Sequence, residues 1–209
     1  MRMEGQNRYK PTKPHDKKVC SESIADASAE ELALRVQKGS QESFAELINR
    51  YGGRLLMLMQ QKTGNINDAE DLVQETFIKA FSNIQKYRST FRFSTWLFTI
   101  ASRLAISHHR KLKLHVDQQE TISDNNPLDA AAEKESSRTL WSLAGRLAPN
   151  QYQVLWLKYV EDMSIKEISK VIGKSQINVK VLIYRARMNL AGQLKDSEPD
   201  NKTLKSATL

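Results

Sequence analysis

The chain has 209 residues, of which 40% are hydrophobic, and it carries a single cysteine and a net charge of +8. This length suits one ordinary domain or two small ones, and the lone cysteine excludes an internal disulfide framework. The positive charge favours an anionic partner such as nucleic acid, and the lack of a long apolar run predicts a cytoplasmic protein without membrane insertion.

The first 28 residues are rich in lysine, arginine and proline and contain few large apolar side chains. Such a segment buries too little surface to offset the entropy of ordering, so we expect residues 1–28 to form a flexible basic tail. From residue 29 onward, apolar residues recur at spacings of three and four, which predicts a helical domain over 29–114. Gly39 divides the first two helices of this domain, and Ser40 is placed to cap the second.

The next predicted helix begins in "NINDAEDLVQETF", where Asn67 and Glu70 resemble a capping box. Its apolar positions share one face, and acidic residues gather on the opposite face near its start. For this helix in isolation we prefer the interpretation that the acids only complement the helix dipole. The charge nevertheless changes sign along the helix, which leaves open a second interpretation in which its two ends meet different partners.

Residues 76–116 contain no aspartate or glutamate but eight lysines and arginines. Within this window a polar loop carries Phe91 and Phe93 alongside Arg88 and Arg92. Aromatic rings beside cations suit single-stranded nucleic acid, because a base stacks on the ring and a phosphate pairs with the charge. We therefore predict that these four side chains contact unpaired DNA.

The following helix, "TWLFTIASRLAISHHRK", places Trp96 in an apolar stripe, which predicts a core position for this ring. Outside the stripe lie Arg103, Ser107, Arg110 and Lys111. These residues form either a solvated helix face or an extension of the DNA-binding surface. The adjacent His108 and His109 have no acid or thiol at a suitable spacing, so we expect no metal site; the sequence also indicates no cofactor and no catalytic residue.

A polar segment over 115–133 predicts a flexible linker to a second helical domain over 134–195, followed by a polar tail over 196–209. In this second domain Ser164 and Glu167 form a capping box, Gly173 ends a short helix, and Ser175 is placed to cap the next one. A short helix, a glycine turn and a longer basic helix predict a helix-turn-helix, whose second helix enters the major groove of duplex DNA.

The final helix divides into an apolar face and a polar face. The outward positions, which are donors to base edges or phosphates except for the tyrosine, are Gln176, Asn178, Lys180, Tyr184, Arg185 and Arg187. A helical hairpin with a solvated charged face would show the same division, but the caps, the glycine turn and the basic helix together favour DNA binding. The sequence thus predicts an all-α protein of two small helical domains joined by a flexible linker, the C-terminal one a helix-turn-helix.

The order of "DAEDLVQETFIKAF", "YRSTFRFSTWLFTIA", an acidic linker and "EISKVIGKSQINVKVLIYRARMNL" resembles the extracytoplasmic-function sigma factors of bacterial RNA polymerase over roughly residues 29–195. The resemblance implies a protein that binds core RNA polymerase, recognises the promoter minus-ten and minus-thirty-five elements and promotes DNA melting. It implies docking on the β′ clamp coiled coil through Asp68, Asp71, Gln74 and Glu75. It also implies two further partners, the β flap and an anti-sigma factor.

The resemblance assigns the two forms of promoter DNA to different parts of the chain. The loop before Trp96 is implied to capture a flipped base of the minus-ten element, and the helix after it to assist strand opening. The helix-turn-helix is implied to read the minus-thirty-five element as a duplex, with Lys180, Tyr184 and Arg185 at positions that contact DNA in the family.

Three positions depart from the family pattern. Where the motif W-L-x-x-I-A-x-N has asparagine, this chain has Arg103, and Ser107 and Val181 also replace the usual residues. Asparagine offers a base both a hydrogen-bond donor and an acceptor, whereas arginine only donates, so we expect altered base contacts at Arg103.

Two other functional classes stay open. The alternative is a helix-turn-helix regulator that never binds polymerase. That alternative gives no role to the aromatic loop or to the helix whose charge changes from acidic to basic along its length. An enzyme acting on nucleic acid fits less well, because no carboxylate cluster and no activated nucleophile is visible.

Overall fold

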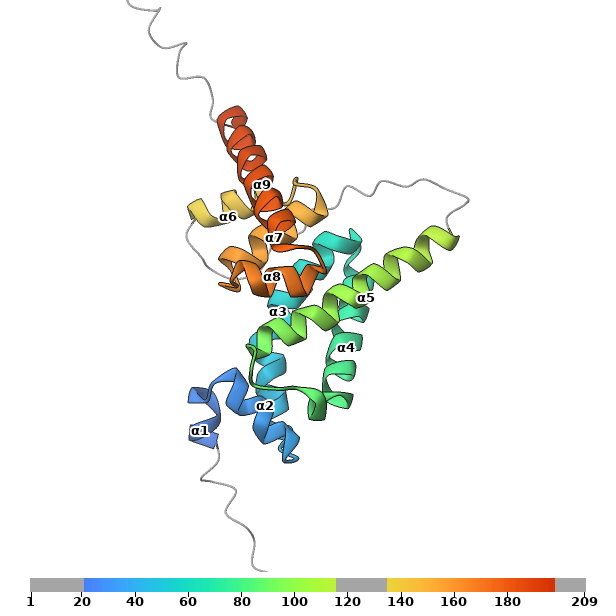
Figure 1. The fold of residues 1–209 in the computed structure, drawn as a ribbon, viewed down its shortest axis with the longest axis vertical. Coiled ribbons are helices and arrows are strands. Elements are labelled where there is room, and N and C mark those ends of the chain that lie inside the picture. The colour runs from blue at the N-terminus through green and yellow to red at the C-terminus, as the bar shows by residue number, and fades with distance from the viewer. Residues whose placement is uncertain (1–20, 116–134, 198–209) are drawn as a thin grey trace, which may run out of the picture.

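The computed structural model describes residues 21–115 and 135–197, and in these ranges the chain is helical without any strand (Figure 1). The N-terminal region comprises α1 (Ser21–Asp26), α2 (Ala29–Gln37), α3 (Gln41–Thr63), α4 (Ile66–Ser82), the 3-10 turn η1 (Ile84–Lys86) and α5 (Phe93–His115). The C-terminal region comprises α6 (Glu135–Ala144), α7 (Pro149–Tyr159), α8 (Ile165–Ile172) and α9 (Gln176–Ser197). The predicted all-α class is confirmed. Residues 1–20, 116–134 and 198–209, which contain most of the predicted tails and linker, lie outside the described residues.

Several helix ends follow from the predicted caps. The Ser40 hydroxyl accepts a hydrogen bond from the Ser43 backbone N–H at 3.2 Å, and Ser164 and Glu167 form a reciprocal capping box at the start of α8. Gly173 ends α8 with φ of 67°, a left-handed conformation that glycine adopts without a Cβ clash. These local signals were predictable because a cap depends on neighbours in sequence.

The start of α4 corrects the predicted capping box at Asn67. The N-cap is Asn65, whose Oδ1 accepts from the backbone N–H groups of Asn67 at 2.8 Å and Asp68 at 3.4 Å. Gly64 turns the chain in the left-handed conformation and leaves Asn65 extended, so the helix begins at Ile66.

The predicted tail also needs correction, because its last residues form α1. The Arg50 guanidinium of α3 donates to the carbonyl oxygens of Ile24, Ala25 and Ala27 at 2.6–3.1 Å. It also pairs with Glu46 at 2.6 Å. One arginine thus satisfies several carbonyl groups that the end of a short helix leaves without intrahelical partners.

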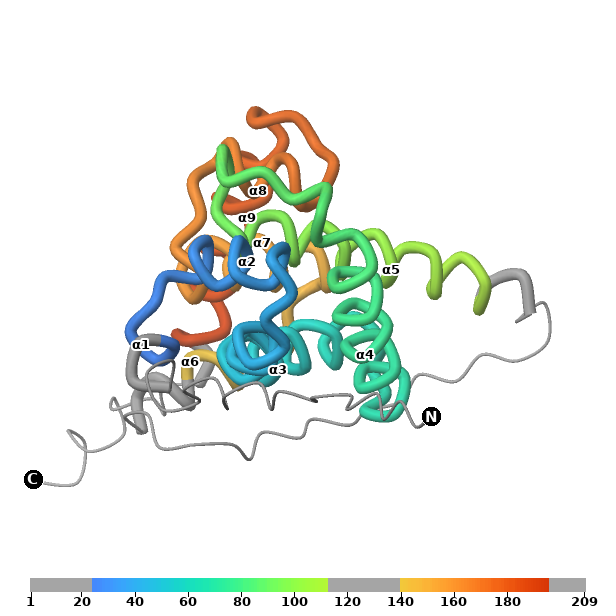
Figure 2. The backbone as a smooth tube through the Cα atoms, turned by 90° about the horizontal axis from the view of Figure 1, so that it is seen from below, coloured from blue at the N-terminus to red at the C-terminus, as the bar shows by residue number. Residues whose placement is uncertain are grey.

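In the N-terminal region α3 is the central helix, packed against α2, α4 and α5. The tube view in Figure 2 shows α5 crossing the region and its far end extending beyond the other helices. The buried faces carry aliphatic residues from each helix, including Leu32, Leu47, Leu72 and Leu97. The described helices include none that is long and apolar enough to cross a membrane.

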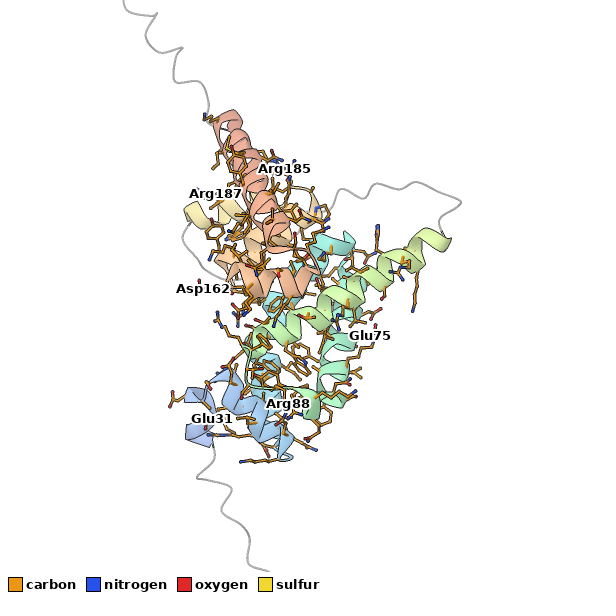
Figure 3. The ribbon with its side chains drawn as sticks, in the orientation of Figure 1. Glu31, Glu75, Arg88, Asp162, Arg185 and Arg187 are labelled. Atoms are coloured by element: carbon orange, nitrogen blue, oxygen red, sulfur yellow. The ribbon has the colours of Figure 1, made fainter. Side chains whose placement is uncertain are left out.

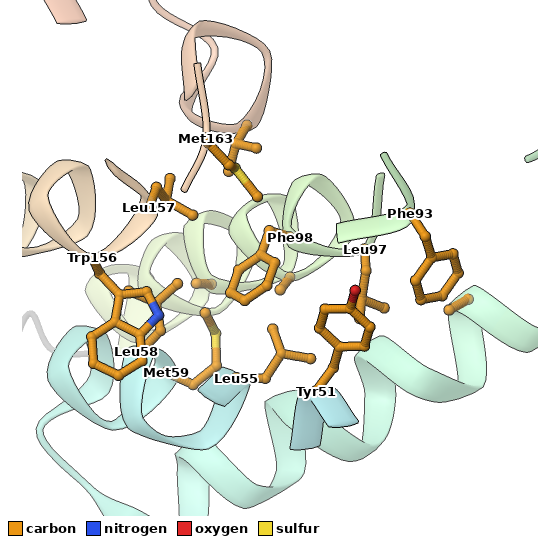
Figure 4. Packing of buried hydrophobic residues seen from close by; sticks show 14 of the residues in the cluster. Tyr51, Leu55, Leu58, Met59, Phe93, Leu97, Phe98, Trp156, Leu157 and Met163 are labelled. Carbon is orange, nitrogen blue, oxygen red and sulfur yellow. The ribbon is translucent and has the colours of Figure 1, made fainter. Parts of the chain in front are cut away.

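The two regions pack against each other through a shared apolar core. Figure 4 shows Leu157 and Met163 of the C-terminal region facing Phe98 of α5. All three side chains are fully buried, and they belong to one continuous cluster with the core of α3. The pairs α5–α8 and α3–α7 form the junction, which no periodicity in the sequence had indicated.

Candidate polymerase and nucleic-acid interfaces

The acidic positions of α4 lie on its outer face. Its inner face buries Ala69, Leu72 and Thr76, whereas Asp71, Gln74 and Glu75 are exposed and Asp68 is partly exposed. Glu75 pairs with Lys79 at 2.7 Å, and Asp68 lies 3.9 Å from the His108 imidazole of α5. The structure therefore brings the four predicted docking residues to one accessible side of the helix.

An apolar groove runs beside this acidic side and was missed at the sequence level. It lies between α3 and α4, has a volume of about 420 Å³, and is lined chiefly by Phe44, Ile48, Phe77, Ile78 and Phe81. Ile78 is 65% exposed and Phe81 is 47% exposed, although the apolar pattern predicts a core position for Phe81. The groove and the acids give this face both charge and apolar surface for a partner.

The aromatic loop before α5 is only partly as predicted. Arg88, Phe91 and Arg92 are exposed, and the Tyr87 hydroxyl donates to the Phe91 carbonyl at 2.9 Å, which fixes the loop. The Arg92 guanidinium, however, donates to the carbonyl oxygens of Asp162 and Glu161 in the C-terminal region. Figure 3 places Asp162 where the two regions meet.

Phe93 corrects the prediction that it stacks on a base, because its side chain is fully buried. Its ring centroid lies 5.6–5.7 Å from those of Tyr51, Tyr87 and Trp96, and its backbone N–H donates to Glu30 at 2.8 Å. The reason is that Phe93 is the first residue of α5 and points into the bundle. Trp96, predicted to be core, packs against the core but is only partly buried.

A basic pocket of about 370 Å³ lies between α4, η1 and α5. It is lined by Lys79, Asn83, Lys86, Trp96, Ile100, Arg103, Leu104 and Ser107. Predicted residues Arg103 and Ser107 thus meet Trp96, while Arg110 and Lys111 continue exposed along α5. Lys79 and Lys86 belong to the acid-free window 76–116 of the sequence, but only the fold shows that they line a pocket together with α5. No sequence pattern indicated a role for Asn83.

In the helix-turn-helix the division of α9 into two faces is as predicted. Val179 and Ala186 are fully buried, and Leu182, Ile183 and Leu190 pack against the core. All six outward residues are exposed, and Figure 3 shows Arg185 and Arg187 on α9. Helical geometry separates them, because Asn178 and Arg185 share one flank, while Lys180 and Arg187 share the other.

A second apolar groove lies in the C-terminal region between α6, α7 and α9. Its volume is about 620 Å³, and its walls include Leu140, Trp141, Tyr159, Tyr184, Arg187 and Met188. Tyr184 and Arg187 therefore line this groove, so only part of the outward face of α9 is left to face DNA alone. In the described residues no group of three or more histidines, cysteines or acids could hold a metal ion.

Comparison with known proteins gives a consistent family. The model of Sigma-70 region 2 matches residues 47–114, and that of Sigma-70 region 4 matches residues 137–190. The chain is 32% identical over 176 residues to the ECF RNA polymerase sigma factor SigW of Bacillus subtilis, covering 78% of this chain and 94% of that one. It is 32% identical over 173 residues to the ECF RNA polymerase sigma factor BldN of Streptomyces coelicolor, covering 79% and 66%.

A solved structure shares the fold. It contains the sigma factor RpoE of Bartonella quintana in complex with the anti-sigma factor NepR, with a TM-score of 0.64 at 22% identity over 75% of this chain and 99% of that one. The two family matches fall on the N-terminal and C-terminal regions in the order that the sequence motifs indicated. The chain therefore belongs to the extracytoplasmic-function sigma factors of bacterial RNA polymerase.

Proposed function

We propose that this sigma factor divides polymerase docking, minus-ten capture and minus-thirty-five recognition among three of its surfaces. The observation that carries the proposal is the separation of charge on the N-terminal region. Acids occupy the outer face of α4, and only cations and neutral residues occupy the 88–92 loop and α5. Two surfaces of opposite sign on one small domain suit a protein partner and DNA at the same time.

The polymerase surface is the outer face of α4. Asp71 and Glu75 are one helical turn apart and exposed, and they offer charge to a basic partner helix. Ile78 continues the same stripe and supplies the apolar contact that charge pairs at an exposed rim lack. We assign this surface, with Asp68 and Gln74, to the β′ clamp coiled coil.

The minus-ten surface combines the 88–92 loop with the basic pocket. Trp96 presents a half-buried ring for stacking, and Lys79, Lys86 and Arg103 surround it with positive charge. Arg103 donates hydrogen bonds and cannot accept them, which favours guanine or phosphate at this position. The exposed Arg110 and Lys111 extend the phosphate-binding track along α5.

The minus-thirty-five surface is the exposed side of α9. Its first turns present Gln176, Asn178 and Lys180, followed by Arg185, and Val181 between them offers only apolar contact, for example to a thymine methyl group. The apolar groove between α6, α7 and α9 adjoins this surface farther along α9 and shares Tyr184 and Arg187 with its outward face. We assign that groove to a helix of the β flap or, when transcription is switched off, of an anti-sigma factor, and we place the protein in the cytoplasm.

The decisive experiment tests docking on polymerase. We expect the double charge reversal of Asp71→Lys and Glu75→Lys to weaken capture by core RNA polymerase by about 2 kcal/mol or more, because like charges then oppose a basic partner. Glu31→Lys and Glu42→Lys, which reverse two exposed acids of α2 and α3, serve as the matched control.

Run-off transcription with the same proteins completes the test. The control should support normal transcripts, and the docking variant should support few. Equal polymerase capture by both would remove the assignment of α4. A wild-type chain that binds duplex DNA but never core polymerase would instead favour a stand-alone helix-turn-helix regulator.

A further inference from the structure

The first two turns of α9 present two large apolar side chains to solvent. Ile177 is 74% exposed, more than any other large hydrophobic residue in the part of the chain that the structure describes, and Val181 is 41% exposed. The N-terminal turns of the second helix of a helix-turn-helix are the part that contacts base edges. Two aliphatic side chains therefore occupy positions where hydrogen-bonding residues usually read the sequence.

The packing of α9 holds these two side chains on the face that points away from the core. Val179, which lies between them in the sequence, is fully buried. A residue two positions away on a helix lies about 200° around its axis, so Ile177 and Val181 both point away from the side that Val179 buries. The Ser175 hydroxyl fixes the start of the helix by accepting a hydrogen bond from the Asn178 backbone N–H at 3.3 Å. The fold thus sets the orientation of one exposed aliphatic stripe.

The surroundings of this stripe are basic. Between residues 168 and 195 the chain contains no aspartate or glutamate, and its lysines and arginines there are Lys170, Lys174, Lys180, Arg185, Arg187 and Lys195. Lys180 and Arg185 are exposed and lie on opposite flanks of the stripe. A second copy of the chain would bring these like charges together, which opposes symmetric pairing through α9. A duplex, in contrast, places phosphates on both sides of the groove that receives the helix.

The stripe is separate from the apolar groove of the C-terminal region. Farther along α9, Tyr184 and Met188 line that groove together with side chains of α6 and α7, whereas Ile177 and Val181 do not. The far part of α9 therefore has apolar walls beside it that suit a protein helix. The first two turns have exposed amides and cations beside them instead, which suit DNA.

The chemistry of the major groove offers one apolar group to such a stripe. Isoleucine and valine side chains neither donate nor accept hydrogen bonds, and among the base edges only thymine carries a methyl group, at C5. Residues four apart on a helix are separated by about 6 Å along its axis, close to two base steps of about 3.4 Å each. Two methyl groups at that separation would match the two side chains.

We propose that Ile177 and Val181 read two thymine methyl groups about two base steps apart in the minus-thirty-five duplex. This inference rests on the proposed function of α9 and goes beyond it by naming the bases that the helix selects. Uracil pairs with adenine as thymine does and lacks only the methyl group. Binding by this chain is therefore sensitive to uracil at those two positions, although every hydrogen bond of the base pair is kept.

The test removes one methyl group at a time. Wild-type holoenzyme first selects its preferred promoter from a pool in which the minus-thirty-five segment is randomised. Each thymine of the selected segment is then replaced singly by uracil, and holoenzyme affinity is measured at one fixed salt concentration. We expect two positions at which uracil weakens binding about three- to five-fold, the fold-change that corresponds to burying one methyl group.

Substitutions in α9 assign each methyl group to a side chain. With Ile177→Ala, uracil at one of the two positions should cause no further loss of affinity, and with Val181→Ala the same should hold at the other position. Both side chains are exposed, so alanine leaves the fold intact, which a thermal melt checks. Leu34→Ala is the matched control, because it removes an aliphatic side chain of α2 that is 41% exposed, as Val181 is. It should keep both uracil effects at full size.

Three results would overturn methyl recognition. One is a selected segment in which no uracil substitution changes the affinity, and another is uracil effects that persist at full size in both Ile177→Ala and Val181→Ala. The third is a loss of polymerase capture by these variants with an unchanged DNA preference, which would assign the stripe to a protein partner. Failure of the proposed function is distinguishable, because wild-type holoenzyme would then select no sequence in the minus-thirty-five segment.

Discussion

The two regions differ in how far their side-chain roles follow from local sequence. In the C-terminal region the capping box at Ser164, the turn at Gly173 and the buried positions of α9 all lie where the sequence places them. In the N-terminal region Phe93, predicted to face DNA, is fully buried, and Trp96, predicted to be core, packs against the core but is only partly buried. The difference shows that periodicity assigns faces well within a helix and poorly at a helix start, where no preceding turn constrains the direction of the side chain.

The largest expected effect tests the burial of Phe93. We expect Phe93→Ala to lower the free energy of unfolding by about 3–5 kcal/mol, because a fully buried ring leaves a cavity among Tyr51, Tyr87 and Trp96. Chemical denaturation measures the loss. Phe91→Ala is the control, since its ring is 41% exposed and its removal should change stability by about 1 kcal/mol or less. A stable Phe93→Ala protein would restore the prediction that this ring serves DNA.

Replacement of Trp96 should affect DNA binding more than folding stability, the opposite of the effect expected for Phe93→Ala. We expect Trp96→Ala to weaken binding of single-stranded minus-ten DNA by about 1–3 kcal/mol through lost stacking, with a smaller loss of folding stability than Phe93→Ala. Trp96→Phe should retain most of the affinity because it keeps an aromatic face. Unchanged binding by Trp96→Ala would leave the basic pocket with a phosphate-binding role only.

Much of the fold follows from the sequence for physical reasons that these residues illustrate. Ser40 and Ser164 cap helices through neighbours three positions away, and Val179 and Ala186 are seven positions apart on one face. Contacts between residues that are far apart in the sequence leave no such pattern in it. Arg92 meets Asp162 across 70 residues, and Arg50 holds α1 across 25 or so, through backbone carbonyls that every residue type possesses. No composition or motif could indicate such pairs.

The junction between the regions adds a pH dependence that the sequence does not predict. Burial raises the pKa of the Glu161 carboxyl above its usual value near 4.5, and the facing Arg54 and Arg92 counteract only part of that rise. The packed junction therefore binds the proton more tightly than a chain in which the two regions are separated and Glu161 is hydrated. Packing of the two regions is fully favoured below the usual pKa and weakens as the pH rises from there to the raised pKa, by at most about 1.4 kcal/mol per pH unit.

Energy transfer between dyes attached at Lys38→Cys and Lys195→Cys, two exposed sites in different regions of a Cys20→Ser chain, measures this effect as a function of pH. The two regions of the wild type should separate progressively with rising pH in that window, and Glu161→Gln, which carries no ionisable group at this site, should have a flatter profile. The Tyr51 hydroxyl also faces Glu161 but titrates well above this range, since burial raises its pKa. Identical profiles for wild type and Glu161→Gln would exclude this carboxyl as the source of the pH dependence.

The smallest expected effect compares the two serine caps directly. Ser40→Ala and Ser164→Ala should each lower the free energy of unfolding by about 1 kcal/mol, because each removes the acceptor for one helix N–H group.

The two serine substitutions should differ in their energetic coupling to Thr95. Ser164 orients Glu167 toward the Thr95 hydroxyl of α5, whereas Ser40 acts within its own region. A double-mutant cycle of Ser164→Ala with Thr95→Val should therefore show a coupling energy of about 0.5 kcal/mol or more, and the cycle with Ser40→Ala should be additive. Additivity in both cycles would mean that the cap and the junction are independent, and the capping box would then stabilise α8 without helping to hold the regions together.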